Sequence, residues 1–319
     1  MGRMISLFSR RRKVPGDHPA FAGLPVSLIT MGDARTRAAV HLRGNFGQRR
    51  LPLVCLAGYT RNMSDFATFA DYFQRLGSGQ WPMVLIDLPG RGRADDRPRT
   101  SQYGTVSDAQ DVADILAALG IGRAVILGQG HGGQVAMALA SRHPLLIGGT
   151  ILLDSGPVTD SRGIVRLRNN QAHLDSLRGS KAVTQGFRRI LGGDYPGHAA
   201  EELDALAARS FWFDKRGRPR ALFDRRLIER IKDISFDDVL VPQWPLYDAL
   251  KCARLMLLRT QLTDQVRRET FEEMVRRRPD AEAVTIMGQG SPALFDQQSE
   301  IEAVAEFVFH AGTARRKAA

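Results

Sequence analysis

One short segment of the sequence has the residue types and spacing of a turn that presents a catalytic nucleophile. An apolar run at 124–128 is followed by Gly-Gln-Gly-His-Gly-Gly at 128–133, and then by an alanine-rich helical segment at 134–143. In such a strand, turn and helix the central residue has strained backbone angles, and small residues two positions before and after it let the strand and helix approach. The central residue here is Gly130, with glycines at both flanking positions.

The chemistry that such a turn normally serves is covalent acyl transfer. That reaction needs an oxygen or sulfur nucleophile and a neighbouring base to take its proton. Gly130 has no side chain, so it adopts the backbone angles of the turn without strain but supplies no nucleophile for the reaction. His131 is a candidate base, although a side chain at this position is expected to pack beside the helix. The other histidines show no metal-ligand spacing, so we predict neither a metal nor a cofactor.

Strands and helices alternate along most of the chain, as they must to position this turn. Apolar runs typical of buried strands occur at 51–57, 83–87, 124–128, 150–154, 254–258 and 283–287, after two amphipathic strand patterns at 26–30 and 37–42. Helical stripes lie between most of the buried runs and after the last one. The pattern predicts one α/β domain with a mostly parallel, eight-stranded sheet and helices on both faces.

The alternation stops between residues 158 and 249, where an arginine-rich helical segment interrupts the strands. An insertion of this size above a parallel sheet indicates a helical lid, whose aromatic residues we expect to pack onto the sheet. The predicted organisation is therefore a core of residues 21–157 and 250–310, with the lid at 158–249. Flexible basic tails are expected at 1–20 and 311–319.

Composition and charge exclude several classes of protein. The 319 residues carry a formal charge of +11, but eight of these charges lie in acid-free tails and leave +3 for the rest, so we predict no nucleic-acid site on the folded core. The longest apolar stretch, residues 144–153, falls short of the roughly 18 residues that a membrane span needs. With only two cysteines, both in apolar runs, the sequence predicts no disulfide framework and a reducing cytoplasm.

Several further segments occur in a characteristic order. They are Gly-Tyr-Thr-Arg-Asn-Met-Ser-Asp-Phe at 58–66, the Asp-x-x-Gly-x-Gly turn at 87–92, Leu-Asp-Ser-Gly-Pro at 153–157 and a late strand leading into Arg259 and Thr263-Asp264. Together with the glycine turn they resemble the α/β-hydrolase superfamily, and more narrowly a bacterial group with a G-x-T-R-N-x-x-D-F segment after its third strand. The resemblance extends from Val26 to Val308 and implies the α/β-hydrolase fold.

The resemblance also implies where a catalytic triad would lie. It puts the nucleophile at Gly130, the acid at Asp264 and the base at Ser291, in the chain order of that fold. Relatives have Ser at the first position and Gly-x-Gly-His-x-Pro around the last, where this chain has Gly-Gln-Gly-Ser-Pro. Two of the three triad members are therefore missing.

An oxyanion hole needs only backbone donors, and the resemblance assigns these to Tyr59 and His131. Gly58 and Arg61 are further candidates for the wall of the pocket. Backbone N–H groups that point into a pocket can bind a carbonyl or carboxylate without cleaving anything.

Two classes of function follow. The residues favour a non-hydrolytic protein that binds a small carbonyl- or carboxylate-containing molecule under the lid, as a sensor, carrier or partner-binding module. The alternative is an active enzyme: an ester or lactone hydrolase whose water is activated by Asp264, Asp154 or His131, or a cofactor-free lyase or oxygenase. Nucleic-acid binding is a third hypothesis that rests only on the basic tails. The sequence does not predict an oligomeric state.

Overall fold

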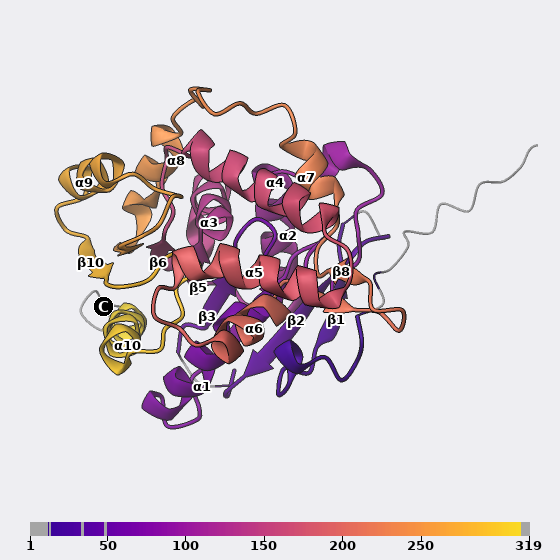
Figure 1. Cartoon of the computed structure of the whole chain (residues 1–319). Coiled ribbons are helices and arrows are strands. Elements are labelled where there is room, and N and C mark those ends of the chain that lie inside the picture. The colour runs from indigo at the N-terminus through magenta and orange to yellow at the C-terminus, as the bar shows by residue number, and fades with distance from the viewer. Residues whose placement is uncertain (1–11, 13, 33–34, 48–49, 314–319) are drawn as a thin grey trace, which may run out of the picture.

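The computed structural model describes residue 12 and residues 14–32, 35–47 and 50–313, and its centre is one eight-stranded sheet (Figure 1). The strands are β1 (Ser27–Thr30), β2 (Arg37–Arg43), β3 (Leu53–Leu56), β4 (Met83–Asp87), β5 (Ala124–Gln129), β6 (Ile147–Leu153), β9 (Arg254–Thr260) and β10 (Glu282–Ile286). Their order is β1-β2-β4-β3-β5-β6-β9-β10. Only the pairs β1–β2 and β2–β4 are antiparallel, which confirms the predicted mostly parallel sheet.

Helices cover both faces of the sheet, as predicted. The long helices of the core are α1 (Ala67–Leu76), α2 (Thr105–Ala118), α3 (His131–Arg142), α9 (Arg268–Arg277) and α10 (Gln298–Thr313), with short 3-10 turns at Pro19–Phe21, Met63–Phe66, Thr100–Gln102, Pro144–Leu146 and Ala249–Cys252. Strand β3 shows the alternation that separates the faces. Leu53 and Cys55 pack with α1 and α10, whereas Val54 and Leu56 pack with α2 and α3.

The insertion, residues 158–249, is mixed rather than wholly helical. Its elements are α4 (Ser161–Ser176), α5 (Ser180–Asp194), α6 (Ala200–Ala208), β7 (Phe211–Phe213), β8 (Pro219–Ala221), α7 (Arg226–Arg230) and α8 (Trp244–Asp248). Strands β7 and β8 form a small antiparallel hairpin. The hairpin turn is closed by Asp214, whose carboxylate accepts backbone hydrogen bonds from Arg216 and Arg218. The sequence predicts only helices here, because a three-residue strand is too short to show a period.

Part of the expected N-terminal tail packs against the core. Arg12 forms an ion pair with Asp96 and donates hydrogen bonds to three backbone carbonyl oxygens of the loop after β4. His18 is buried and its ring lies 3.4 Å from the backbone oxygen of Phe211 in the insertion. The described part of residues 1–20 is therefore not a free tail, because its polar groups are paired with the core.

The last helix also extends further than predicted. Helix α10 continues to Thr313, so the expected boundary at residue 311 falls inside it. Most of the charged tail residues lie at 1–11, 13 and 314–319, outside the described residues. Within the described part of the chain, no helix is both long enough and apolar enough to cross a bilayer.

Candidate active site and ligand cavity

The turn between β5 and α3 has the geometry that its glycines predict. Gly130 has φ +52° and ψ −115°, outside the regions that residues with a side chain normally occupy. The flanking glycines are required for packing, since a Cβ at Gly128 would lie 2.4 Å from the Gly132 oxygen and one at Gly132 would lie 2.2 Å from the Leu56 oxygen. A Cβ at Gly130 would meet only the Cα of Gly58, at 3.9 Å. The turn thus has space for a Cβ at position 130, although glycine has no Cβ.

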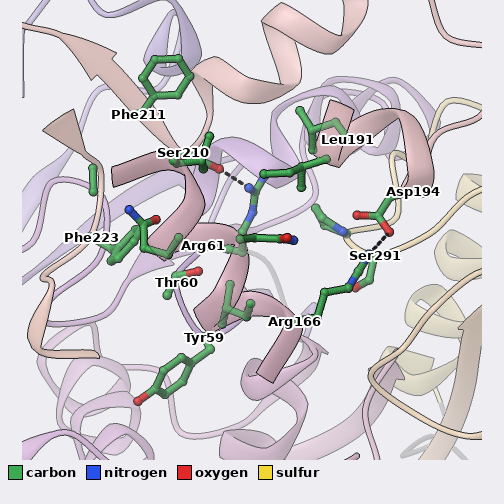
Figure 2. Close-up of a pocket in the computed structure, with 18 of the residues that line it drawn as sticks. Tyr59, Thr60, Arg61, Arg166, Leu191, Asp194, Ser210, Phe211, Phe223 and Ser291 are labelled. Carbon is green, nitrogen blue, oxygen red and sulfur yellow. Dashed lines mark hydrogen bonds and ion pairs between the residues drawn. The ribbon is translucent and has the colours of Figure 1, made fainter. Parts of the chain in front are cut away.

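A cavity of about 190 Å³ lies between this turn and the insertion. All seven site residues predicted from the sequence line it: Gly58, Tyr59, Arg61, Gly130, His131, Asp264 and Ser291. The insertion adds an apolar wall that includes Leu167, Leu174, Val183, Phe187, Ile190, Leu191, Phe211 and Phe223. Figure 2 shows Phe211 and Phe223 on the side of the cavity away from Ser291 and Asp194. The folded chain therefore brings the predicted positions together around one space, to which the insertion contributes both apolar and charged side chains.

Ser291, at the histidine position, faces a carboxylate that is not Asp264. Its side chain is close enough to Asp154, which directly follows β6, to lower the pKa of that carboxylate. The same carboxylate accepts hydrogen bonds from the backbone N–H of Thr260 at 2.7 Å and from its hydroxyl at 2.8 Å. Burial raises the pKa of Asp154 to about 6, although these hydrogen bonds lower it. Asp154 thus joins the ends of β6 and β9 and lies close to Ser291 at the cavity.

Asp264, at the acid position, is held by the insertion. Arg166 of α4 donates through Nε to Asp264 and through Nη1 to Asp194, the second contact at 2.8 Å. The Gln265 side chain donates to the other Asp264 oxygen at 2.7 Å. Figure 2 shows the Arg166–Asp194 pair beside Ser291. The carboxylate of Asp264 is therefore engaged in tying α4 to the core.

His131 points its ring into a buried ionic network. Its Nε2 lies 2.8 Å from the Asp108 carboxylate, which also pairs with Arg91 and Arg97, each at 3.0 Å. Burial acts to raise the pKa of Asp108, but Arg91, His131 and Arg97 together hold it well below its usual range. The His131 ring also packs edge-on against Tyr59. The ring therefore packs beside the helix, while the backbone of His131 starts α3 at the cavity.

The G-x-T-R-N-x-x-D-F segment joins the core to the insertion. Arg61 donates through Nε to Asp65 at 2.8 Å and through Nη1 to the hydroxyl of Ser210, as Figure 2 shows for the second contact. Asn62 donates to the backbone oxygen of Arg209 at 2.7 Å. Burial acts to lower the pKa of Arg61, but Asp65 raises it, so the guanidinium stays charged. Arg61 acts here as a paired structural cation that fixes the loop after β3.

Gln129 is one of the cavity residues that were not among the candidates from the sequence. Gln129, the last residue of β5, is 2% exposed and lines the cavity. Among the described residues, neither Nε2 nor Oε1 of its side chain has a hydrogen-bond partner. The available signal was a polar residue at the end of an otherwise apolar strand, directly before the turn.

Comparison with known proteins identifies the family to which the chain belongs. The sequence model of the alpha/beta hydrolase family matches residues 53–307, and the chain belongs to that family. A crystal structure of an alpha/beta hydrolase from Novosphingobium aromaticivorans is similar with a TM-score of 0.76 and 26% identity, over 89% of this chain and 98% of that one.

Curated relatives are similar over different extents. The chain is 23% identical to a 3-hydroxybutyrate-oligomer hydrolase from Cupriavidus necator, over 85% of this chain and 92% of that protein. It is 32% identical to a serine hydrolase-like protein from Danio rerio, but over only 33% of this chain and 31% of the relative. The chain thus belongs to a family that includes hydrolases. Its own activity has to be inferred from the residues that line its cavity.

Proposed function

We propose that this protein binds a small carbonyl- or carboxylate-containing molecule in the cavity, with the insertion as its lid, and does not cleave it through an acyl-enzyme. The observation that carries the proposal is Gly130, since the turn that presents a nucleophile in this fold holds a residue without a side chain. Acyl transfer at this position lacks both the attacking oxygen and the histidine that would take its proton.

Backbone donors support binding at the same place. His131 is the first residue of α3, and the first amides of a helix have no partner within the helix. Helix N-termini attract negative charge and partly negative oxygens. Together with the amide of Tyr59, which follows β3, this end of α3 favours a ligand oxygen beside Gly130.

The three alternative bases considered from the sequence are all engaged. Asp154 bonds to Thr260, Asp264 to Arg166, and His131 to Asp108. Activation of a water by any of them would have to use a lone pair or ring nitrogen that its present partners leave free. This arrangement favours binding over hydrolysis.

A second candidate function is ester hydrolysis by Ser291. The observation in its favour is that the Ser291 side chain is close enough to Asp154 to lower the pKa of that carboxylate, which at about 6 leaves it mostly ionised at neutral pH. A carboxylate that accepts the hydroxyl proton would make Ser291 the nucleophile of a two-residue site.

Covalent labelling separates the two candidates. A fluorophosphonate probe followed by intact-mass spectrometry should leave this protein unlabelled under conditions that label an ordinary serine hydrolase completely. Stoichiometric labelling that disappears in a Ser291→Ala variant would support the second candidate and overturn the first.

Binding is tested by a thermal-shift screen of small esters, lactones, ketones and carboxylic acids, run beside product assays on the same compounds. A ligand at a hundred times its Kd should stabilise the fold by about 2.7 kcal/mol, which a melting curve resolves easily. Stabilisation without product supports the proposal, and steady turnover contradicts it.

We also propose a cytoplasmic location, because Cys55 and Cys252 are both free thiols. Fractionation of cells that express a tagged full-length chain would test it.

A further inference from the structure

The ring of Phe211 lies between the ligand cavity and a second cavity. Phe211 lines both spaces, and the second one has a volume of about 410 Å³. Phe187, which lines the ligand cavity but not the second one, stacks on the Phe211 ring with 4.1 Å between ring centroids. Phe213, which lines the second cavity but not the first, meets the same ring edge-on at 5.0 Å. One buried aromatic ring therefore separates the two spaces.

Helix α5 presents an apolar stripe to the ligand cavity. Its members that line the cavity are Val183, Phe187, Ile190 and Leu191. Residues at positions i, i+4, i+7 and i+8 lie on one face of a helix, so this face is the one that α5 turns toward the cavity. A helix rises about 1.5 Å per residue, which makes the stripe about 12 Å long. A stripe of this length suits an extended alkyl chain.

The stripe leads away from the candidate active site toward Phe211. Helix α5 ends at Asp194, whose backbone oxygen accepts a hydrogen bond at 2.6 Å from the N–H of Gly290, directly before Ser291. Phe187, about two turns earlier in the helix, carries the stack on Phe211. Figure 2 shows Phe211 on the side of the cavity away from Ser291 and Asp194. A ligand whose oxygen lies at the glycine turn can therefore extend its apolar part along α5 to Phe211.

Charged side chains of the cavity wall are paired with one another. Arg166 bonds to Asp264 and, at 2.8 Å, to Asp194. Arg225 pairs with Asp175 at 2.6 Å. An alkyl tail that packs on the α5 stripe separates none of these pairs, so it meets no cost from an unpaired ion.

We propose that the ligand is an acyl compound with an unbranched alkyl tail, that this tail packs along the α5 stripe, and that the Phe211 ring sets its maximum length. The inference rests on the proposed function, because it names the ligand class of the same cavity and the residue that selects within that class. Removal of the ring joins the ligand cavity to the second cavity, whose apolar lining includes Ala207, Ala208 and Trp212. A longer tail then has apolar surface to cover.

A series of unbranched carboxylic acids tests the inference on the full-length chain by calorimetry. The probes are the even-numbered acids from butanoate to tetradecanoate, each used below its micelle concentration. In the parent, affinity should rise by up to about fourfold per methylene and then fall at the length where the tail meets Phe211. A Phe211→Ala variant should move this limit at least two methylenes further, and should bind the first acid beyond the parent limit about tenfold more tightly than the parent does.

Further variants separate the length limit from general loosening of the insertion. Phe213→Ala is the matched control, because Phe213 lies on the same strand and lines only the second of the two cavities, so the parent limit should remain. Ala208→Phe refills the second cavity, so adding it to Phe211→Ala should return the limit to that of the parent. If Phe211→Ala fails to fold, Phe211→Leu takes its place, with the melting temperature of each variant measured first.

The outcomes separate this inference from the proposed function. Affinity that does not depend on chain length, an unchanged limit in Phe211→Ala, or an equal shift in Phe213→Ala overturns the inference. The proposed function still stands in each of these cases if compounds of the thermal-shift screen bind without turnover. If no acid binds and that wider screen is also blank, the proposed function fails and the inference fails with it.

Discussion

Placing a serine at Gly130 and a histidine at Ser291 is the most direct test of whether these two side chains separate the proposed binding site from that of a serine hydrolase. Gly130→Ser introduces a side chain where no atom obstructs its Cβ within 3.9 Å, so the cost is backbone strain at φ +52° alone. Such strain costs about 1–3 kcal/mol. Gly132→Ser is the matched control, because its Cβ would lie 2.2 Å from a backbone oxygen and should prevent normal folding.

Activity should appear only when both groups are present. Gly130→Ser without a base, or Ser291→His without a nucleophile, should hydrolyse esters hardly faster than the parent. The double variant should exceed either single variant by about 10²-fold or more, because a positioned base contributes about 10²–10⁴-fold and triad members act as a unit. The new histidine should be oriented by Asp154, since Ser291 already lies close enough to lower the pKa of that carboxylate, whereas Asp264 is held by Arg166.

The assay is release of p-nitrophenol from p-nitrophenyl acetate at pH 8, with unfolding by urea to confirm that each variant folds. Adding Asp264→Asn to the double variant should leave most of the activity, and adding Asp154→Asn should remove it. A folded double variant no faster than the single variants would refute the view that only two side chains separate this cavity from a hydrolase. Activity that depends on Asp264 instead would refute the assignment of Asp154.

Three further predictions concern stability. Arg12→Ala should lower the free energy of unfolding by about 1–3 kcal/mol, because it removes the ion pair with Asp96 and hydrogen bonds to three backbone oxygens; unchanged urea midpoints would contradict this. Arg166→Met should lower the melting temperature at pH 7 and progressively less as the pH falls, because burial raises the pKa of Asp194 and this carboxylate loses its charge before an exposed one; a loss independent of pH would count against the bridging role. Burial raises the pKa of Glu300 to about 7, so its folded state binds protons more tightly than its unfolded state, and the parent should lose stability as pH rises from 5 to 8. The melting temperature of Glu300→Gln relative to the parent should therefore increase over that range, and a constant difference would disprove the shift.

The alternation of apolar runs and helical stripes was enough to predict the sheet, its mostly parallel character and the helices on both faces. These features depend on local periodicity and on the rule that a parallel strand buried on both faces is apolar throughout. The glycine turn could also be predicted from the sequence, because the close approach of β5 and α3 excludes any side chain at Gly128 or Gly132. The short hairpin β7–β8 was not, since three residues carry no period.

The sequence by itself thus determined the order of strands and helices, the glycine turn and the lack of a side chain at its centre, since each of these is a property of residues close together in the chain. Only the tertiary structure decided which carboxylate lies near Ser291, because the pairing of β6 with β9, and of β9 with β10, brings together the strand ends that carry Asp154 and Ser291. The same holds for Gln129, whose chain position gives no sign that its side chain is buried without a partner. A hydrogen-bond partner is a matter of distance in space, and the amino-acid sequence specifies that distance only through the whole fold.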